Sequence, residues 1–418
     1  MILSFSRITS FSKFLNSFWN FVTTKSGLLF IHILWVLFII LLFIFKYFRK
    51  VYKNKGFKIA LQQFLLRLML PFLVLFFSIK WIIDYNTSED FDYKWNYSVE
   101  NTSQKIAQKF SNDGRFRGMN VYRLGRRKID KTLDNLIKNN VEWISVIPYL
   151  YQKDEKSIEI SPSTAKNEWS KRDSIFIKNI VKTRKKGFSI LLKPHIWMSD
   201  GWRSNINFDD DKNWNIWFDE YQRIQIHYAH LAEKTNSELF CIGTELRSSL
   251  DKRPKRWLSL IKKIKSIYKG KLTYAANWDD SFEFTEFWNE LDYIGIQAYY
   301  PLTKVKNPDL ETIKNGWQPH LLKLEKLSKK YNKQILFTEV GYRNDLYATI
   351  EPWSWGSFFQ RLYRKKSNKV QLLAYQALYE ELWNKEWFAG TFPWEWNSSD
   401  FPVQGTPSEN MIAIWYSK

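Results

Sequence analysis

The amino-acid sequence predicts a (β/α)8 barrel that is preceded by one or two transmembrane helices. Two features of the 418 residues carry this prediction. A long apolar stretch without charged side chains lies near the N-terminus, and from about Phe116 onward short apolar runs alternate with amphipathic helical stretches. This alternation is typical of β–α units around a parallel sheet, and about 300 residues suit eight such units.

The N-terminal region contains two apolar stretches. The first, Gly27–Phe45, has 19 residues and no Asp, Glu, Lys or Arg. It approaches the roughly 20 residues that cross a hydrocarbon core, and it is too long for the apolar part of a signal peptide. The second, residues 60–83, carries Arg67 and Lys80 near its ends, where long side chains can reach the interface. We expect a transmembrane region at residues 25–83, with spans at about 27–45 and 60–83, after a basic segment at residues 1–24.

Basic residues set the expected orientation of these spans. Six Lys or Arg residues lie between the two stretches and three precede the first, so the loop between them should lie in the cytoplasm. With two spans, the following domain faces the periplasmic or extracellular side of a bacterial inner membrane. With one span, the same rule places that domain in the cytoplasm. Residues 84–105 are polar and predict a linker, and the barrel is expected at residues 106–418.

Eight strand candidates define the expected barrel. They are Phe116–Tyr122, Val141–Tyr149, Ser189–Trp197, Leu239–Leu246, Lys271–Trp278, Tyr293–Tyr300, Gln334–Tyr342 and Phe388–Asn397. Helical patterns fill the gaps between them, for example at Lys131–Lys138, Trp214–Glu233, Lys255–Tyr268 and Leu310–Tyr331. Gly187 and Gly270 fall where a helix end requires a positive φ. A doubly wound sheet would carry a glycine-rich phosphate loop after its first strand, and Arg-Leu-Gly-Arg-Arg stands there instead.

Composition excludes several other classes of protein. The net charge is +21, but Lys and Arg are scattered along the expected helices and form no single arm, so we expect no nucleic-acid partner. Cys241 is the only cysteine, which excludes an intrachain disulfide and a cysteine-based zinc site. No metal or organic cofactor is implied. The 21 Trp, 22 Tyr and 32 Phe suit stacking on sugar rings, although core filling explains most single aromatic residues.

Two glutamates stand at predicted strand ends, where barrels of this kind place their catalytic groups. Glu245 lies at the end of the fourth predicted strand and Glu339 at the end of the seventh, 94 residues later. Three β–α units of ordinary length separate them, so they should face each other across the barrel mouth. Cleavage of a glycosidic bond needs one carboxyl group that protonates the leaving oxygen and another that attacks the anomeric carbon or activates water. We predict that Glu245 and Glu339 form this pair.

Three motifs resemble glycoside hydrolase family 113, which includes β-mannanases. They are Lys193-Pro194-His195, Gly243-Thr244-Glu245-Leu246 and Thr338-Glu339-Val340-Gly341-Tyr342. The resemblance covers roughly residues 110 to 418. It implies an oligo- or polysaccharide substrate with β-linkages, such as β-1,4-mannan or manno-oligosaccharides. It also implies that Glu245 is the general acid/base and Glu339 the nucleophile of a double displacement with retention.

The resemblance further implies a set of substrate-binding residues. These are His195, Thr244, Asn277, Tyr299, Trp394 and Trp396. Tyr299 matches an aromatic residue that hydrogen-bonds the nucleophile, and Trp394 or Trp396 would form a platform under the sugar. Thr244 replaces the Asn that much of this group of enzymes has before the acid/base, and it can still donate to a sugar 2-hydroxyl.

Other residues are assigned structural places. Glu395 is expected to point to the other side of its strand, Asp279 and Asp280 to form a loop, and Cys241 to pack inside the barrel. The Trp-rich stretches Trp197–Trp217 and Trp353–Trp355 are expected to shape the cleft. Two alternatives stay open: a non-catalytic, membrane-anchored glycan-binding or scaffolding protein with this barrel, and a basic membrane protein that binds anionic polymers.

Overall fold

The structure is a computed structural model, and it separates into two compact units that meet between Asn86 and Thr87. It describes residues 25–89, 91, 106–107, 113–121, 124, 129–161, 166–198, 200–279, 281–355 and 364–418. The expected basic segment at residues 1–24, most of the expected linker, Tyr122 and Asp280 lie outside the described residues.

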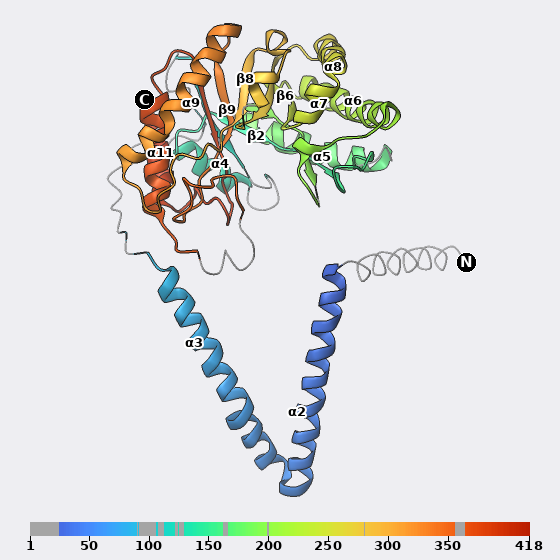
Figure 1. The fold of residues 1–418 in the computed structure, drawn as a ribbon, viewed down its shortest axis with the longest axis vertical. Coiled ribbons are helices and arrows are strands. Elements are labelled where there is room, and N and C mark those ends of the chain that lie inside the picture. Colours follow the sequence, from blue (N-terminus) through green and yellow to red (C-terminus); the bar gives the residue numbers. More distant parts are fainter. Residues whose placement is uncertain are drawn as a thin grey trace, which may run out of the picture. The chain divides into compact units, whose positions relative to one another are not determined.

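The first unit is a helical hairpin (Figure 1). Its elements are α2 (Lys25–Phe64), the π-helical turn η1 (Leu65–Met69) and α3 (Leu70–Thr87). Gly56 interrupts α2 with a φ of 78° and a ψ of 170°, a conformation that glycine adopts without a steric penalty. One helical stretch, Ile31–Tyr85, is long and apolar enough to cross a membrane, a property that N-terminal signal sequences share.

The second unit contains a closed barrel of eight parallel strands, so the predicted fold class is confirmed. The strands follow the order β1-β10-β9-β8-β7-β6-β4-β2 around the barrel. Their bounds are β1 Phe116–Asn120, β2 Trp143–Val146, β4 Ser189–Leu192, β6 Leu239–Thr244, β7 Lys271–Asn277, β8 Tyr293–Gln297, β9 Ile335–Val340 and β10 Phe388–Pro393. Each lies within one of the eight predicted strands.

Helices surround the barrel and follow its strands in sequence (Figure 1). They are α4 Ile129–Lys138, α5 Lys166–Lys185, α6 Asp211–Lys234, α7 Arg247–Lys252, α8 Pro254–Ile267, α9 Leu310–Tyr331, α11 Asn368–Leu382 and α12 Pro407–Tyr416. Short 3-10 turns lie at η2 Arg203–Asn205, η3 Ser281–Phe284 and η4 Trp288–Glu290. Asp210, Asp309 and Ser367 cap α6, α9 and α11 by accepting a backbone N–H of the first turn.

The hydrophobic core has two layers. A small cluster fills the barrel interior and includes Leu191, Ala275 and Leu336 with Cys241, which is fully buried as predicted. A larger cluster lies between the strands and the helices, where Trp217 of α6 stacks on Tyr221 at 5.2 Å. Because side chains fill the barrel interior, a ligand cannot bind inside it, and an active site is expected at the C-terminal ends of the strands.

The second and third predicted strands are shorter in the barrel than expected. Each breaks at a proline, Pro148 or Pro194, because proline has no N–H for the ladder. Beyond the breaks the chain forms a separate two-stranded sheet of β3 (Tyr149–Gln152) and β5 (His195–Met198). This sheet extends the barrel wall past its C-terminal rim.

The two glycines predicted at positive φ differ in outcome. Gly187 has a φ of 88°, as expected for a helix end. Gly270 is not at positive φ, so that prediction is wrong. A Cβ atom at Gly270 would lie 2.1 Å from the hydroxyl oxygen of Tyr268, and close packing therefore explains this glycine.

Candidate active site

A cavity of about 700 Å³ opens at the C-terminal ends of the strands. It brings together predicted residues from six separate segments of the chain. Glu245 follows β6, Asn277 ends β7, Tyr299 follows β8, Glu339 lies on β9 and Trp394 follows β10. His195, the first residue of β5, also lines it. Both glutamates therefore share one cavity, as the strand assignment predicted.

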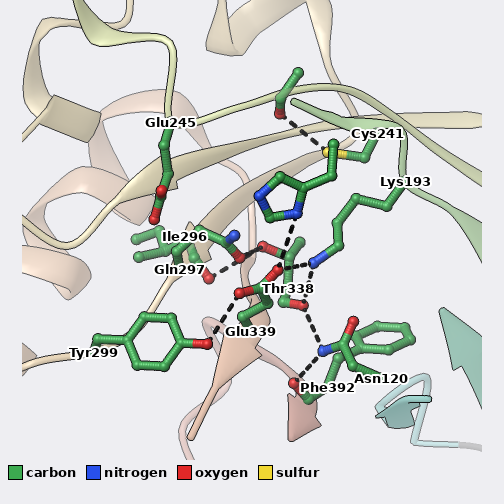
Figure 2. Close-up of polar contacts among 12 residues, drawn as sticks. Asn120, Lys193, Cys241, Glu245, Ile296, Gln297, Tyr299, Thr338, Glu339 and Phe392 are labelled. Carbon is green, nitrogen blue, oxygen red and sulfur yellow. Dashed lines mark hydrogen bonds and ion pairs between the residues drawn. The ribbon is translucent and has the colours of Figure 1, made fainter. Parts of the chain in front are cut away.

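Glu339 sits in a set of buried donors. The Lys193 ammonium donates a short hydrogen bond to Oε1 of Glu339, and the Tyr299 hydroxyl donates to Oε2 at 3.0 Å (Figure 2). Glu339 is 3% exposed and Lys193 is 0% exposed, so the ion pair is shielded from water. The two hydrogen bonds therefore hold this carboxylate in one orientation.

The strand that carries Glu339 is fixed through the preceding residue. The Thr338 carbonyl accepts from Asn120 Nδ2 at 3.1 Å and from Lys193 Nζ at 3.4 Å, and the Thr338 hydroxyl lies 3.2 Å from Gln297 Oε1 (Figure 2). These contacts come from three other strands or strand ends. The Glu339 backbone is therefore held by the barrel itself and not by a loop.

Two residues beside Glu339 are neutral at physiological pH. Burial, and then the neighbouring Glu339 carboxylate, raise the pKa of Tyr299 well above its usual value, so this phenol keeps its proton. Burial, followed by the charges of Arg203 and Lys193, lowers the pKa of His195 well below its usual value. Both ring nitrogens of His195 are buried and have no hydrogen-bond partner among the described residues, so the neutral imidazole beside the cavity has hydrogen-bonding capacity that the protein does not use.

Glu245 lies in a different electrostatic environment. Burial raises its pKa to about 7, the nearby Arg203 opposes that rise, and the charge of Glu339 adds to it. Arg203 Nη2 lies 2.6 Å from Glu245 Oε2. At neutral pH a substantial share of Glu245 is therefore protonated, which suits a general acid. The unequal environments of two neighbouring carboxyl groups separate their roles.

The backbone of Glu245 is also unusual. Its φ is 54°, a left-handed conformation that few residues other than glycine adopt. The conformation is held by hydrogen bonds from its N–H to the Ala275 carbonyl at 2.9 Å and from the Ser204 hydroxyl to its own carbonyl at 2.8 Å. Such over-determined backbone positions cluster at functional sites.

Tryptophans form much of the cavity wall. They are Trp197, Trp202, Trp278, Trp353, Trp355 and Trp394. Trp278 and Trp353 stack at 4.7 Å, and Trp197 meets Trp355 edge to face at 6.3 Å. Trp197, Trp202 and Trp353 remain about two-fifths exposed, at 42%, 39% and 40%, so their faces are open to a ligand.

Some predicted residues lie outside the cavity lining. Trp396 is 0% exposed and packs in the core, whereas Trp394 lines the cavity. Thr244 is buried behind Glu245, and its hydroxyl has no hydrogen bond among the described side chains. Glu395 is buried and does not line the cavity, which agrees with its expected direction. Asp279, expected as part of a loop, lies in a turn but also lines the cavity.

Sequence reasoning assigned no role to two residues at the centre of this site. Lys193 belongs to the motif Lys193-Pro194-His195, but its partner Glu339 is 146 residues away, so the sequence did not indicate the ion pair. Arg203 lies on a short turn with no periodic pattern. In the described parts of the chain, no group of three or more His, Cys, Asp or Glu side chains is placed to hold a metal ion.

Comparisons with known proteins agree with this architecture. The model of glycoside hydrolase family 113 matches residues 122–417. A family 113 β-1,4-mannanase solved as a complex is 24% identical, with a TM-score of 0.62 over 73% of this chain and 99% of its own. The family 113 β-mannanase AaManA from Alicyclobacillus acidocaldarius, in complex with ManMIm, is 22% identical, with a TM-score of 0.61 over 74% and 99%.

The sequence has no significant match among the curated proteins. The two mannanase structures share the barrel fold with this chain. The family match spans well over half of the 418 residues and contains both glutamates, and this family indicates a glycoside hydrolase. The chain therefore belongs to glycoside hydrolase family 113.

Proposed function

We propose that this protein is a retaining β-glycosidase that cleaves β-1,4-linked mannan or manno-oligosaccharides. The observation that carries the proposal is the shared cavity of Glu245 and Glu339, in which one carboxyl group is paired with a buried lysine and the other has a pKa of about 7. The names of the similar structures, both β-mannanases, support the choice of sugar.

The proposed reaction has two steps. In the first, a Glu339 carboxylate oxygen attacks the anomeric carbon while the glycosidic C–O bond breaks, and Glu245 gives its proton to the leaving oxygen. In the second, Glu245 takes a proton from water, the water oxygen attacks the anomeric carbon, and the bond to Glu339 breaks. Two inversions restore the original configuration.

The remaining cavity residues would bind the sugar. His195 and Asn277 offer polar atoms to hydroxyl groups, and Tyr299 would orient the nucleophile by its hydrogen bond at 3.0 Å. Trp394 would provide the platform under the ring being cleaved. Trp396 and Thr244, which do not line the cavity, would act only through the residues they support. No metal or organic cofactor enters this scheme.

Hydrolysis by the full-length protein in detergent tests the proposal. We expect turnover of β-1,4-manno-oligosaccharides in a panel with gluco- and xylo-oligosaccharides and aryl β-glycosides. Glu339→Gln should abolish turnover, and Glu245→Gln should reduce it strongly except with leaving groups that need no proton. Glu395→Gln is the matched control, because it makes the same change at a buried carboxyl group outside the cavity.

Binding of manno-oligosaccharides without turnover would support the alternative of a non-catalytic glycan-binding protein. Wild-type-like behaviour of both Glu→Gln variants would contradict the assignment of the pair. Binding that ignores sugars and depends steeply on salt would instead point to the anionic-polymer alternative.

We also propose that the helical hairpin spans a bacterial inner membrane twice, with the barrel on the periplasmic or extracellular side. Arg67 donates to the Tyr47 hydroxyl at 3.3 Å across the hairpin. This contact puts the inner ends of the two apolar stretches at one level, because Tyr47 follows the first and Arg67 precedes the charge-free part of the second. The segment between the two apolar stretches, residues 46–59, holds six Lys or Arg residues and no acidic residue, which favours a cytoplasmic loop and an anionic lipid surface.

Cysteine labelling tests this topology. In a Cys241→Ala background, Asn54→Cys marks the hairpin loop and Lys304→Cys marks an exposed barrel site. In intact spheroplasts we expect a membrane-impermeant maleimide to label position 304 and not position 54. Labelling of position 54 alone would contradict the proposed orientation, and equal release of both variants into the soluble fraction would contradict a membrane location.

A further inference from the structure

The acid/base Glu245 has a dedicated cation in the structure. Arg203, on the short turn η2, lies with Nη2 at 2.6 Å from Glu245 Oε2, and the Arg203 side chain is 10% exposed. We infer that Arg203 is a positioning residue that keeps Glu245 able to lose its proton at neutral pH, so that Glu245 can act as an acid and then as a base. This inference rests on the proposed function.

The turn that carries Arg203 is anchored from two sides. Glu155 accepts from the Trp202 backbone N–H at 2.9 Å and from Asn205 Nδ2 at 3.0 Å. Ser204 donates from its hydroxyl to the Glu245 carbonyl at 2.8 Å. The same short segment therefore holds both the backbone of Glu245 and the cation beside its carboxyl group.

Stacking restricts the Arg203 side chain further. Its guanidinium lies 4.5 Å from the centre of the Trp202 ring, a distance at which a cation is attracted to the ring face. Glu245 Oε2 accepts no hydrogen bond in the described part of the chain despite the short contact. The 2.6 Å contact therefore acts on Glu245 through charge, which favours the carboxylate over the protonated acid.

Other charged and titratable groups also face Glu245. They are Glu339 on β9, Lys193 between β4 and β5, Asp279 after β7, Tyr274 on β7 and Tyr299 after β8. Glu339 and Asp279 raise the pKa of Glu245, while Lys193 lowers it less than Arg203 does. Both tyrosines have raised pKa values and remain neutral. Arg203 is therefore the main counterweight to burial at this carboxyl group.

This counterweight matters between the two steps of the reaction. Proton transfer to the leaving oxygen leaves Glu245 as a carboxylate, which Arg203 stabilises. The carboxylate must then accept a proton from water so that the water oxygen can attack the anomeric carbon while the bond to Glu339 breaks. Without the arginine, burial would return a proton to Glu245 at neutral pH, and the glycosyl-enzyme would lack its base.

The test compares Arg203→Gln and Arg203→Met with Arg203→Lys in the full-length protein in detergent. Arg203→Met keeps an apolar side chain against Trp202, and it serves as the second neutral variant if Arg203→Gln folds poorly. The pKa of Glu245 is read from 13C NMR of protein labelled at the glutamate carboxyl carbon, with Glu245→Gln for assignment. We expect both neutral variants to raise this pKa by about 1–3 pH units, and Arg203→Lys to retain most of the wild-type value.

Kinetics provide the second readout. With activated aryl β-mannosides, the neutral variants should lower kcat by about tenfold for each pH unit gained and lower KM as the glycosyl-enzyme accumulates. With manno-oligosaccharides, whose leaving oxygen needs a proton, they should move the alkaline limb of kcat/KM to higher pH. Arg223→Gln is the matched control, since it removes the same charge from a residue on α6 that pairs with Glu220 at 2.5 Å and does not line the cavity, and it should leave the limb in place.

An unchanged Glu245 pKa in both neutral variants, with an active wild type, would overturn the inference alone. So would a rise in KM with no movement of the pH limb, because that pattern indicates only lost substrate contacts. A wild type without turnover would overturn the proposed function, and the role given to Arg203 with it.

Discussion

Lys193→Met removes the charge that holds Glu339 and keeps a side chain of similar length. Lys193 is 0% exposed and Glu339 is 3% exposed, so solvent cannot replace the lost ammonium group. Removing one partner of a buried ion pair costs about 3–5 kcal/mol. We expect the free energy of unfolding to fall by that amount at neutral pH, unless Glu339 takes up a proton and loses its nucleophilic charge.

Turnover should fall for the same reason. If the loss of 3–5 kcal/mol appears in the transition state, kcat/KM drops roughly a hundredfold to several thousandfold. The assay pairs urea unfolding, followed by near-UV circular dichroism, with hydrolysis of an aryl β-mannoside. The double variant Lys193→Met/Glu339→Gln is the control, because it removes both charges and should recover part of the stability while staying inactive.

A particular outcome would refute this reasoning. It is a Lys193→Met protein that unfolds within about 1 kcal/mol of wild type and retains its kcat/KM. Such a protein would show that the ion pair is not needed for either the buried site or the nucleophile.

Three further predictions follow from the site. Because burial raises the pKa of Glu245 to about 7 and the acid must be protonated, kcat/KM for poor leaving groups should fall above about pH 7, whereas dinitrophenyl glycosides should show no such fall; a shared fall would contradict Glu245 as the acid. Burial, then the charge of Glu339, raise the pKa of Glu395 to about 8, so the folded state retains a proton that the unfolded state has released. Wild type should therefore lose about 4 kcal/mol relative to Glu395→Gln between pH 5 and pH 9 in urea titrations, and parallel stability curves would exclude this protonation. Trp353→Ala removes one ring of the Trp278 stack and should cost about 1 kcal/mol, or roughly a fivefold higher KM, for long manno-oligosaccharides but not for short aryl glycosides; equal effects on both would place the stack at the cleavage point.

The barrel could be predicted from the sequence because its signal is local and repeated. Each strand is a short apolar run, and α9 coincides with the predicted helix Leu310–Tyr331. Pro148 and Pro194 were also visible in the sequence, but the consequence of the breaks was not, since β3 and β5 are separated along the chain by α5 and β4 and pair only in the folded structure. Gly270 was predicted from a need for positive φ, whereas in the structure the side chain of Tyr268 leaves no room for a Cβ atom at this position.

The site was predictable only in part. Glu245 and Glu339 stand out as charges after apolar runs at strand ends, and the barrel topology alone implies that they meet. The pairing of Lys193 with Glu339 and of Arg203 with Glu245 depends on side chains that meet across the barrel, so spacing along the chain does not reveal it. The choice between Trp394 and Trp396 likewise required the path of the chain after β10.

The central claim is that Glu339 becomes covalently bonded to the sugar. The enzyme is incubated with a 2-deoxy-2-fluoro-β-mannosyl fluoride. The fluorine at C2 slows both steps of the reaction, and the fluoride at the anomeric carbon leaves readily, so the glycosyl-enzyme accumulates. Proteolysis and mass spectrometry then locate the sugar. We predict one adduct on the peptide that contains Glu339 and none in Glu339→Gln; an adduct on another residue, or none in an enzyme that hydrolyses the substrate, would contradict this account.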